Sequence, residues 1–147
     1  MPPGLNVSDT SGDNKKVRIH TAAVTLGAED SGKVHIFNSA TAFTLTLPAV
    51  ATAGSGWNAK FIIGTPPGSS THTISENTAS DTNVIHGGFT ESAHTDGTTA
   101  ASTAGTGVTT INFDASAIKG DFVDVVCDGT SWYAFGLAQA DATATFA

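Results

Sequence analysis

The stretch GDFVDVVCDGTSWYAFG, residues 120–136, is the densest apolar segment of this 147-residue chain. Two apolar runs flank the pair Asp128-Gly129, and an Asp-Gly pair in such a setting is one of the stronger sequence signals for a β-hairpin. The segment therefore predicts a hairpin that turns at Asp128-Gly129. A type I′ turn there would need positive φ at both central residues.

Strand parity predicts which side chains of this hairpin share a face, because successive side chains of a strand point to opposite sides. With a loop of two or four residues, one face carries Val123, Val125, Cys127, Trp132, Ala134 and Gly136, and the other carries Phe122, Asp124, Val126, Tyr133, Phe135 and Leu137. A three-residue loop would exchange the faces of the second strand. Both assignments leave large apolar side chains on each side. We therefore expect a second sheet, the chain's own arms or another subunit to cover both faces.

The same period-two alternation recurs along the chain. Phe43, Leu45 and Leu47 share a face in ATAFTLTLPAV (residues 40–50). In GWNAKFIIG (residues 56–64) the residues that share a face are Trp57, Ala59, Phe61 and Ile63, with Asn58 and Lys60 on the other. KVRIH (residues 16–20) and VTTINF (residues 108–113) are further strand candidates. Ser and Thr make up about a quarter of the chain, and β-branched Thr suits a pleated surface.

One helical turn is predicted, in DASAIKG (residues 114–120), with Asp114 as N-cap and Gly120 as the stop. We therefore expect an all-β protein, a compact antiparallel β-sandwich or β-barrel-like domain with a flexible N-terminal arm and at most one short helical turn.

Chain length and composition indicate a single domain. We expect a polar flexible arm at residues 1–16, one β domain at residues 17–137, and a C-terminal tail at residues 138–147 that is an arm or an edge strand. Residues 90–107 contain no large apolar side chain. A segment that buries so little is expected to be a mobile loop or to be ordered by a partner.

Charge and hydropathy exclude two classes of partner. The six Lys and Arg residues are scattered and the net charge is −7, whereas phosphate binding needs clustered cations, so we expect no nucleic-acid partner. No segment approaches the roughly 18 apolar residues of a membrane span, and the first residues lack a signal-peptide pattern. We expect no membrane partner and no export by a standard signal. Cys127 is the only cysteine, so no intrachain disulfide can form.

No catalytic, cofactor-binding or metal-binding residues are predicted, and we do not expect an enzyme. The five histidines lack metal-ligand spacing, and no G-x-S-x-G element or phosphate-binding glycine loop occurs. Asp121, Asp124 and Asp128 have no EF-hand frame and are interpreted as solvated or turn residues. Cys127 is interpreted as a small core residue. The aromatic side chains of the strands are interpreted as core or interface groups.

Two segments carry a resemblance to a known group of proteins. SGKVHIFNSATAFTLTLPA followed by AGSGWNAKFIIG (residues 31–64) resembles a block in structural proteins of tailed bacteriophages, a strand, a turn and a strand ending in Leu-Pro, then a Gly-rich strand. GDFVDVVCDGTSWYAFG (within residues 120–137) looks like the closing block of the same proteins. Such proteins include capsid decoration, or cement, proteins and distal pieces of tail fibres.

The small size, the absence of a repeat or coiled coil and the N-terminal arm are more similar to a decoration protein. The resemblance implies a β-rich homotrimer on the capsid surface of the virion, with the major capsid protein as partner and no catalytic residues or cofactor. The candidate interface residues are Val17, Ile19, Phe122, Val126, Trp132, Tyr133, Phe135, Leu137 and Phe146. The alternative is a receptor- or carbohydrate-binding module of a phage tail fibre, using Trp57 or Trp132 with the polar loop 90–107. A small hydrolase is a third and weaker hypothesis.

Overall fold

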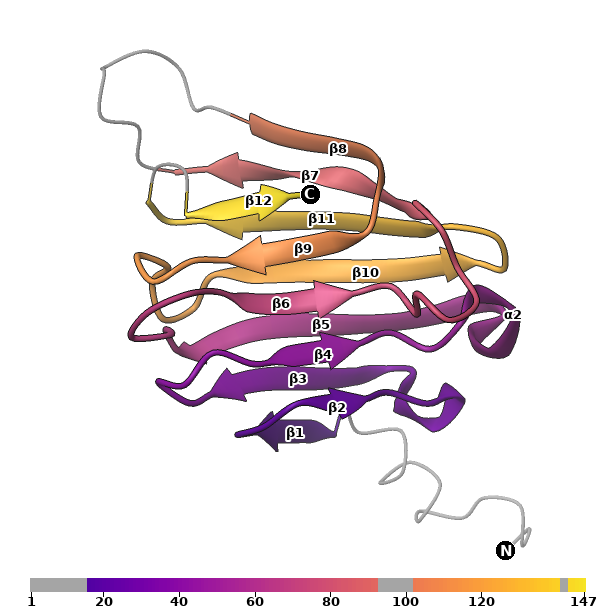
Figure 1. Ribbon diagram of the computed structural model, residues 1–147, viewed down its shortest axis with the longest axis horizontal. Helices are drawn as coiled ribbons and strands as arrows, with labels where there is room; N and C mark the ends of the chain where they lie inside the picture. Colours follow the sequence, from indigo (N-terminus) through magenta and orange to yellow (C-terminus); the bar gives the residue numbers. More distant parts are fainter. Residues whose placement is uncertain (1–15, 93–101, 141–142) are drawn as a thin grey trace, which may run out of the picture.

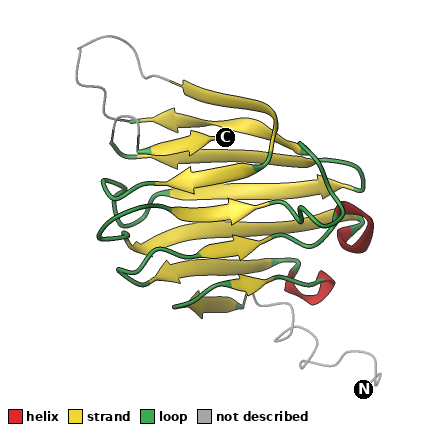
Figure 2. Cartoon of the chain, viewed as in Figure 1, coloured by secondary structure: helices red, strands yellow, loops and turns green. Residues whose placement is uncertain are grey.

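The computed structural model describes residues 16–92, 102–140 and 143–147. Two β-sheets stack face to face and form a sandwich (Figures 1 and 2). The seven-stranded sheet has the order β1-β3-β5-β10-β11-β7-β8, with β1 Val17–His20, β3 Lys33–Asn38, β5 Ser55–Thr65, β7 Ile85–Glu91, β8 Ser102–Val108, β10 Phe122–Asp128 and β11 Trp132–Ala138. The five-stranded sheet has the order β12-β9-β6-β4-β2, with β2 Val24–Thr25, β4 Thr44–Thr46, β6 His72–Ser75, β9 Thr110–Phe113 and β12 Ala144–Phe146.

The first half of the chain passes back and forth between the two sheets. Strands β1 to β7 alternate between the layers, so that β1, β3 and β5 pair in parallel in one sheet and β2, β4 and β6 pair in parallel in the other. The β10–β11 hairpin is then inserted between β5 and β7. The all-β sandwich is thus confirmed, but its pairing is mixed rather than purely antiparallel. Parallel neighbours need a crossover, and here a strand of the opposite sheet supplies it.

The core lies between the sheets, where the predicted period-two faces meet. Leu45 and Leu47 from one layer and Phe61 and Ile63 from the other are completely buried. Trp57 of β5 and Trp132 of β11 pack edge to face with ring centroids 5.1 Å apart. The alternation in residues 40–50 and 56–64 therefore identified the buried side correctly, whereas in β1 the apolar Val17 and Ile19 are exposed and His20 is buried.

Within the described residues, helical structure is confined to two short turns, the 3₁₀ turn η1 at Ala28–Asp30 and the helix α2 at Val50–Ala53, which Figure 2 shows in red. The helical turn predicted at residues 114–120 is wrong. The Asp114 carboxylate accepts a hydrogen bond from Ser116 N at 2.7 Å, and the Asp114 carbonyl accepts one from Ala117 N at 3.1 Å. The segment is nevertheless a turn and not a helix. Asp114 favours such a turn because its side chain bonds the backbone two residues on.

The segments expected to be loop or tail are partly in the sheets. β7 extends to Glu91, and residues 102–108 form β8, an edge strand antiparallel to β7, so the loop prediction was wrong there. Ladder hydrogen bonds order a strand of small residues without large buried side chains. Within the tail, β12 pairs with β9 as an edge strand. Residues 1–15 of the expected arm and residues 93–101 of the expected loop lie outside the described residues. In the described part of the chain, no helix is long and apolar enough to span a membrane.

Candidate assembly face

The register of the β10–β11 hairpin confirms the predicted faces. Phe122 pairs with Leu137, and Cys127 pairs with Trp132, which leaves residues 128–131 as a four-residue loop. The side of the hairpin that carries Val123, Val125, Cys127, Trp132 and Ala134 is buried in the core. The opposite side points away from the second sheet, so nothing within the described chain covers it completely. The expectation of cover on both sides is therefore met on one side only.

Asp128 shapes the hairpin turn through its side chain and not through a left-handed backbone. Gly129 has φ of 98°, but Asp128 does not have positive φ, so the predicted type I′ turn at these two residues is wrong. The Asp128 carboxylate accepts bonds from Thr130 N at 2.7 Å, Ser131 N at 2.8 Å and the Tyr133 hydroxyl at 3.0 Å. The bond from the Thr130 N–H contributes most to lowering the pKa of Asp128 to about 2.

The outward side chains of the seven-stranded sheet lie in three rows that cross the strands. From β1 to β11 the register places Ile19, Ile36, Ile62, Phe122 and Leu137 in the first row, Val17, Val34, Lys60, Asp124 and Phe135 in the second, and Asn58, Val126 and Tyr133 in the third. On β7 the three rows continue with Thr90, Gly88 and His86. We call the surface formed by these three rows the apolar face. Its side chains include the two most exposed large apolar groups of the described chain, Ile19 and Phe135, each 63% exposed. Such a face is typical of a surface that contacts another molecule.

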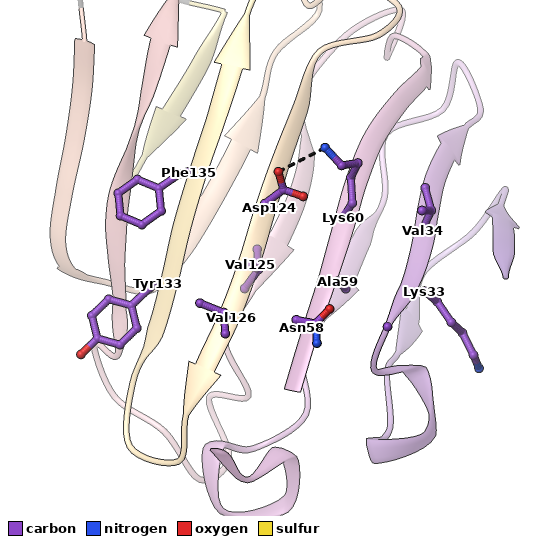
Figure 3. Close-up of a pocket in the computed structure, with 11 residues that line it drawn as sticks. Lys33, Val34, Asn58, Ala59, Lys60, Asp124, Val125, Val126, Tyr133 and Phe135 are labelled. Atoms are coloured by element: carbon purple, nitrogen blue, oxygen red, sulfur yellow. Dashed lines mark hydrogen bonds and ion pairs between the residues drawn. The ribbon is translucent and has the colours of Figure 1, made fainter. Parts of the chain in front are cut away.

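The three rows contain one charged pair, at the centre of the face, and Lys33 and Lys119 border two hollows beside it. Lys60 Nζ lies 3.1 Å from Asp124 Oδ2, and the same ammonium lies 3.9 Å from the centroid of the Phe122 ring. Figure 3 shows the pair between β5 and β10, with Tyr133 and Phe135 on the adjacent strand. No other Lys, Arg, Asp or Glu belongs to the three rows. A mostly apolar surface with few charges has the composition of an interface centre.

Two hollows lie on this face. One of about 230 Å³ is bordered by Lys60, Asp124, Tyr133 and Phe135. The other, of about 330 Å³, is bordered by Ile19, Ile36 and Ile62 of the first row and by Lys119. Both are open enough to receive side chains from a partner.

The outward side of the five-stranded sheet differs sharply in chemistry. We call it the polar face; its rows consist of Thr25, Thr46, Ser75 and Thr110, and of Thr44, Thr73, Asn112 and Thr145. Thr73 Oγ1 donates to Asn112 Oδ1 at 3.0 Å, and Asn112 Nδ2 donates to Thr110 Oγ1 at 3.1 Å. Hydroxyl and amide groups of this kind are well solvated, so the polar face needs no partner.

Seven of the nine predicted interface residues lie on the apolar face: Val17, Ile19, Phe122, Val126, Tyr133, Phe135 and Leu137. Trp132 does not, because its side chain is completely buried. Phe146 also lies elsewhere, half-buried against Phe89 with ring centroids 5.2 Å apart. Both are corrected to core residues. Val34, Ile36 and Ile62 were missed, because β3 and β5 carry apolar side chains on both sides and only the register shows where the outward ones meet.

Polar groups in the interior serve the fold. Glu76 accepts the backbone N–H groups of Asn83 and Val84 at 3.0 and 2.9 Å, and Asp121 accepts those of Ile118 and Gln139, each at 2.9 Å. Each carboxylate therefore fixes loops by satisfying buried donors. Among the described residues, no group of three or more His, Cys, Asp and Glu is placed to hold a metal ion. His94 lies outside them.

The end of the core beside β1 is closed by charged and imidazole groups. Asp30 receives bonds from Lys33 Nζ at 2.9 Å, from Gly27 N at 3.0 Å and from Arg18. Burial opposes ionisation of this carboxyl, but these bonds lower its pKa to about 2. Beside it, His20 Nε2 lies 2.9 Å from Nδ1 of His35. Burial, followed by repulsion from His20, lowers the pKa of His35 to about 4.

No protein-family model matches the chain, and no curated protein or solved structure is significantly similar to it. The contrast between the apolar face and the polar face is therefore the main structural evidence on function.

Proposed function

We propose that this chain is a structural virion protein that binds the outside of a bacteriophage capsid and stabilises it by bridging neighbouring capsid subunits, as a head decoration or cement protein does. The observation that carries the proposal is the apolar face, a broad uncovered surface opposite a fully polar one. Apolar area that leaves water contributes about 25 cal/mol per Å². Many copies on one shell would add such contacts together.

The resemblance to phage structural proteins and the apolar face involve the same strands. Residues 31–64 include β3 and β5, and residues 120–137 include β10 and β11. These four strands are adjacent in the order β3-β5-β10-β11 and form the centre of the seven-stranded sheet. The two segments that resemble phage proteins thus contribute four adjacent strands to the apolar face, while β4 of the first segment lies in the other sheet. The shared strands support an assembly role for the apolar face.

The difference between the two outer faces suits attachment from one side. A protein surrounded by solvent would keep both outer faces polar, whereas a protein seated on a shell needs one polar face only. We place the apolar face toward the assembly and the hydroxyl-rich polar face toward solvent. The homotrimer that the resemblance implies stays a prediction.

The alternative is a receptor- or carbohydrate-binding module of a phage tail fibre. Trp57 and Trp132, the tryptophans expected to stack on a sugar, are 2% and 0% exposed, so neither offers a platform. The observation that favours this alternative is a different pair of aromatic side chains. Tyr133 and Phe135 are exposed beside a hollow that Asn58, Lys60 and Asp124 also border, and aromatic rings with nearby polar groups are typical of small-molecule sites.

Sedimentation with capsids tests the proposal. Capsids of the host virus that lack this protein are mixed with wild-type protein, with Phe135→Asp and with Thr46→Asp, a matched control on the polar face. Wild type and Thr46→Asp should pellet with capsids and raise their melting temperature, and Phe135→Asp should bind at least about tenfold more weakly. Equal binding of both variants would contradict the role of the apolar face. Glycan binding without capsid binding would favour the tail-fibre module.

A second experiment concerns the N-terminal arm. Deleting residues 1–16 is expected to weaken capsid binding and to leave the melting temperature of the β domain nearly unchanged. Full capsid affinity of the truncated protein would count against a contact by the arm. Electron microscopy of the virion would show whether the protein lies on the shell or on the tail.

A further inference from the structure

We propose that the apolar face binds a second copy of this chain, in a two-fold pairing whose axis runs parallel to the strands, between β5 and β10. The pairing concerns the isolated protein, in which it is an alternative to the homotrimer that the resemblance implies. It does not require the virion role proposed above, in which the capsid would occupy this face in place of the second copy. It follows from the order of side chains in the rows, from the charge of the face and from its area.

The first and second rows are symmetric in character about the line between β5 and β10, whereas the third row has Asn58 on one side and Val126 and Tyr133 on the other. The first row has Ile36 and Ile62 on one side of the line and Phe122 and Leu137 on the other, and all four are apolar. The second row reads Val34 and Lys60 on one side, then Asp124 and Phe135 on the other. When the order of this row is reversed and laid against the original, each apolar group meets an apolar group and each charge meets the opposite charge.

A half-turn about the proposed axis performs this reversal. It places β5 over β10 of the second copy and keeps each row at the same level along the strands. Lys60 then faces Asp124 of the second copy, Asp124 faces Lys60 of the second copy, and the apolar ends of both rows meet apolar partners. This is the isologous contact that a closed two-fold dimer requires, in which the same patch serves both copies.

The charge distribution makes the apolar face the part of the surface where a second copy meets the least repulsion. The chain carries a net charge of −7, so two copies repel each other over most of their surfaces. The three rows contain only Lys60 and Asp124, which cancel, and their Nζ and Oδ2 atoms are already 3.1 Å apart within one chain. Two apolar faces in contact would place four charges in an alternating square, in which every close neighbour has the opposite sign.

The area is sufficient for a reversible dimer. The half-turn places β5 over β10, β3 over β11 and β1 over β7. Six strands spaced about 4.8 Å apart, with about four to six residues each at about 3.3 Å, span roughly 29 Å by 13–20 Å. Each copy would thus bury roughly 500 Å², and the total of roughly 1,000 Å² lies near the lower limit of specific interfaces. We therefore expect dissociation in the micromolar range and no permanent dimer.

Sedimentation velocity on the purified full chain, from about 1 to about 100 µM, tests the pairing over the range in which an interface of this size dissociates. Wild type and Thr46→Asp should pass from monomer to dimer. Phe135→Asp should raise the dissociation constant at least about tenfold, and Phe135→Thr, which suits a strand and adds no charge, should raise it as well. Circular dichroism would show that each variant is folded.

A charge exchange tests whether Lys60 and Asp124 lie at the centre of the interface. Lys60→Glu gives each copy two acidic groups at the centre of the face, and Asp124→Lys gives each copy two basic ones. Each variant alone should be largely monomeric, because like charges would face one another. An equimolar mixture should form a heterodimer at least as tight as the wild-type dimer, because residue 60 of one copy faces residue 124 of the other.

Three outcomes would overturn the proposal: a wild type that is monomeric at the highest concentration, a trimer, or a mixture of the charge variants that associates no better than either alone. Capsids take no part in these measurements, so a failure of the two-fold pairing would not contradict the proposed capsid binding. In the same way, a protein that dimerises as described and does not bind capsids would contradict only the proposed function.

Discussion

Protonation of His35 is predicted to destabilise the fold in weakly acidic solution. The imidazole is completely buried, stacks on Phe61 with ring centroids 5.2 Å apart, and lies within hydrogen-bond distance of His20. Burial, then repulsion from His20, lowers its pKa from 6.5 to about 4. The folded protein therefore holds His35 neutral at pH values where the unfolded chain binds a proton.

The sign and size of the effect follow from this difference. Because the folded pKa is the lower one, the stability is fully present above about pH 6.5 and is lost as the pH falls toward 4. At about 1.36 kcal/mol per pKa unit, the loss amounts to about 3 kcal/mol. For a domain of this size that corresponds to a fall in melting temperature of roughly 6–12 °C. The pKa of His20 is lowered too, chiefly by burial, and acts in the same direction.

Urea unfolding of wild type and His35→Phe at intervals from pH 7 to pH 4 measures the effect. The phenyl ring keeps the stacking on Phe61 and cannot take up a proton, so the free energy of unfolding should fall with pH by about 3 kcal/mol less in the variant. The pKa values of Asp30 and Asp128 are lowered to about 2, so the stability that these carboxylates provide is lost only below about pH 4, outside this range. Equal slopes for the two proteins between pH 6.5 and pH 4 would refute this account of His35.

Three further predictions concern stability near neutral pH, each measured by urea unfolding. Glu76→Ala should lower the free energy of unfolding by about 2–3 kcal/mol, because two backbone N–H groups lose a buried acceptor. The control Glu29→Ala removes an exposed carboxylate and should change the free energy of unfolding by less than about 0.5 kcal/mol. Trp132→Ala should cost about 3–5 kcal/mol, since it empties a site in the centre of the core. Phe135→Thr should change the stability of the monomer by less than about 0.5 kcal/mol despite the loss of a large aromatic group, because Phe135 is 63% exposed, and a larger loss would show that it packs within the domain.

The buried side of several strands could be predicted from the sequence, because side-chain parity is a local property. The alternation in residues 40–50 and 56–64 identified Leu45 and Phe61 as inward-pointing, and the hairpin signal grouped Cys127 with Val125 and Trp132 on one face. These positions depend on a period of two and on the turn length, and both can be read from a few neighbouring residues.

Strand order could not be predicted in the same way. Whether β5 pairs with β3, with β10 or with both depends on contacts between residues far apart in the chain, and short apolar strands are compatible with several partners. The parallel pairing was missed for this reason, because a crossover of a few residues that itself contains a strand resembles a hairpin connection in sequence. The edge strand β8 was missed because its small residues gain order from the ladder to β7 and not from burial.

The apolar face arises from the alignment of several strands and is not visible in the sequence of any single strand. The outward residues of β5 include Asn58, Lys60 and Ile62. This mixed set does not predict an apolar surface when the strand is read alone. Only the pairing of Lys60 with Asp124 places their charges opposite each other and leaves the flanking positions apolar. A slip of one residue between β5 and β10 would turn the core side of one strand outward, so burial of Phe61 and Val125 enforces the register. The packing that stabilises the monomer thus also fixes the charge pattern that a second copy would recognise, and a variant that weakens the core register should lose self-association before it unfolds.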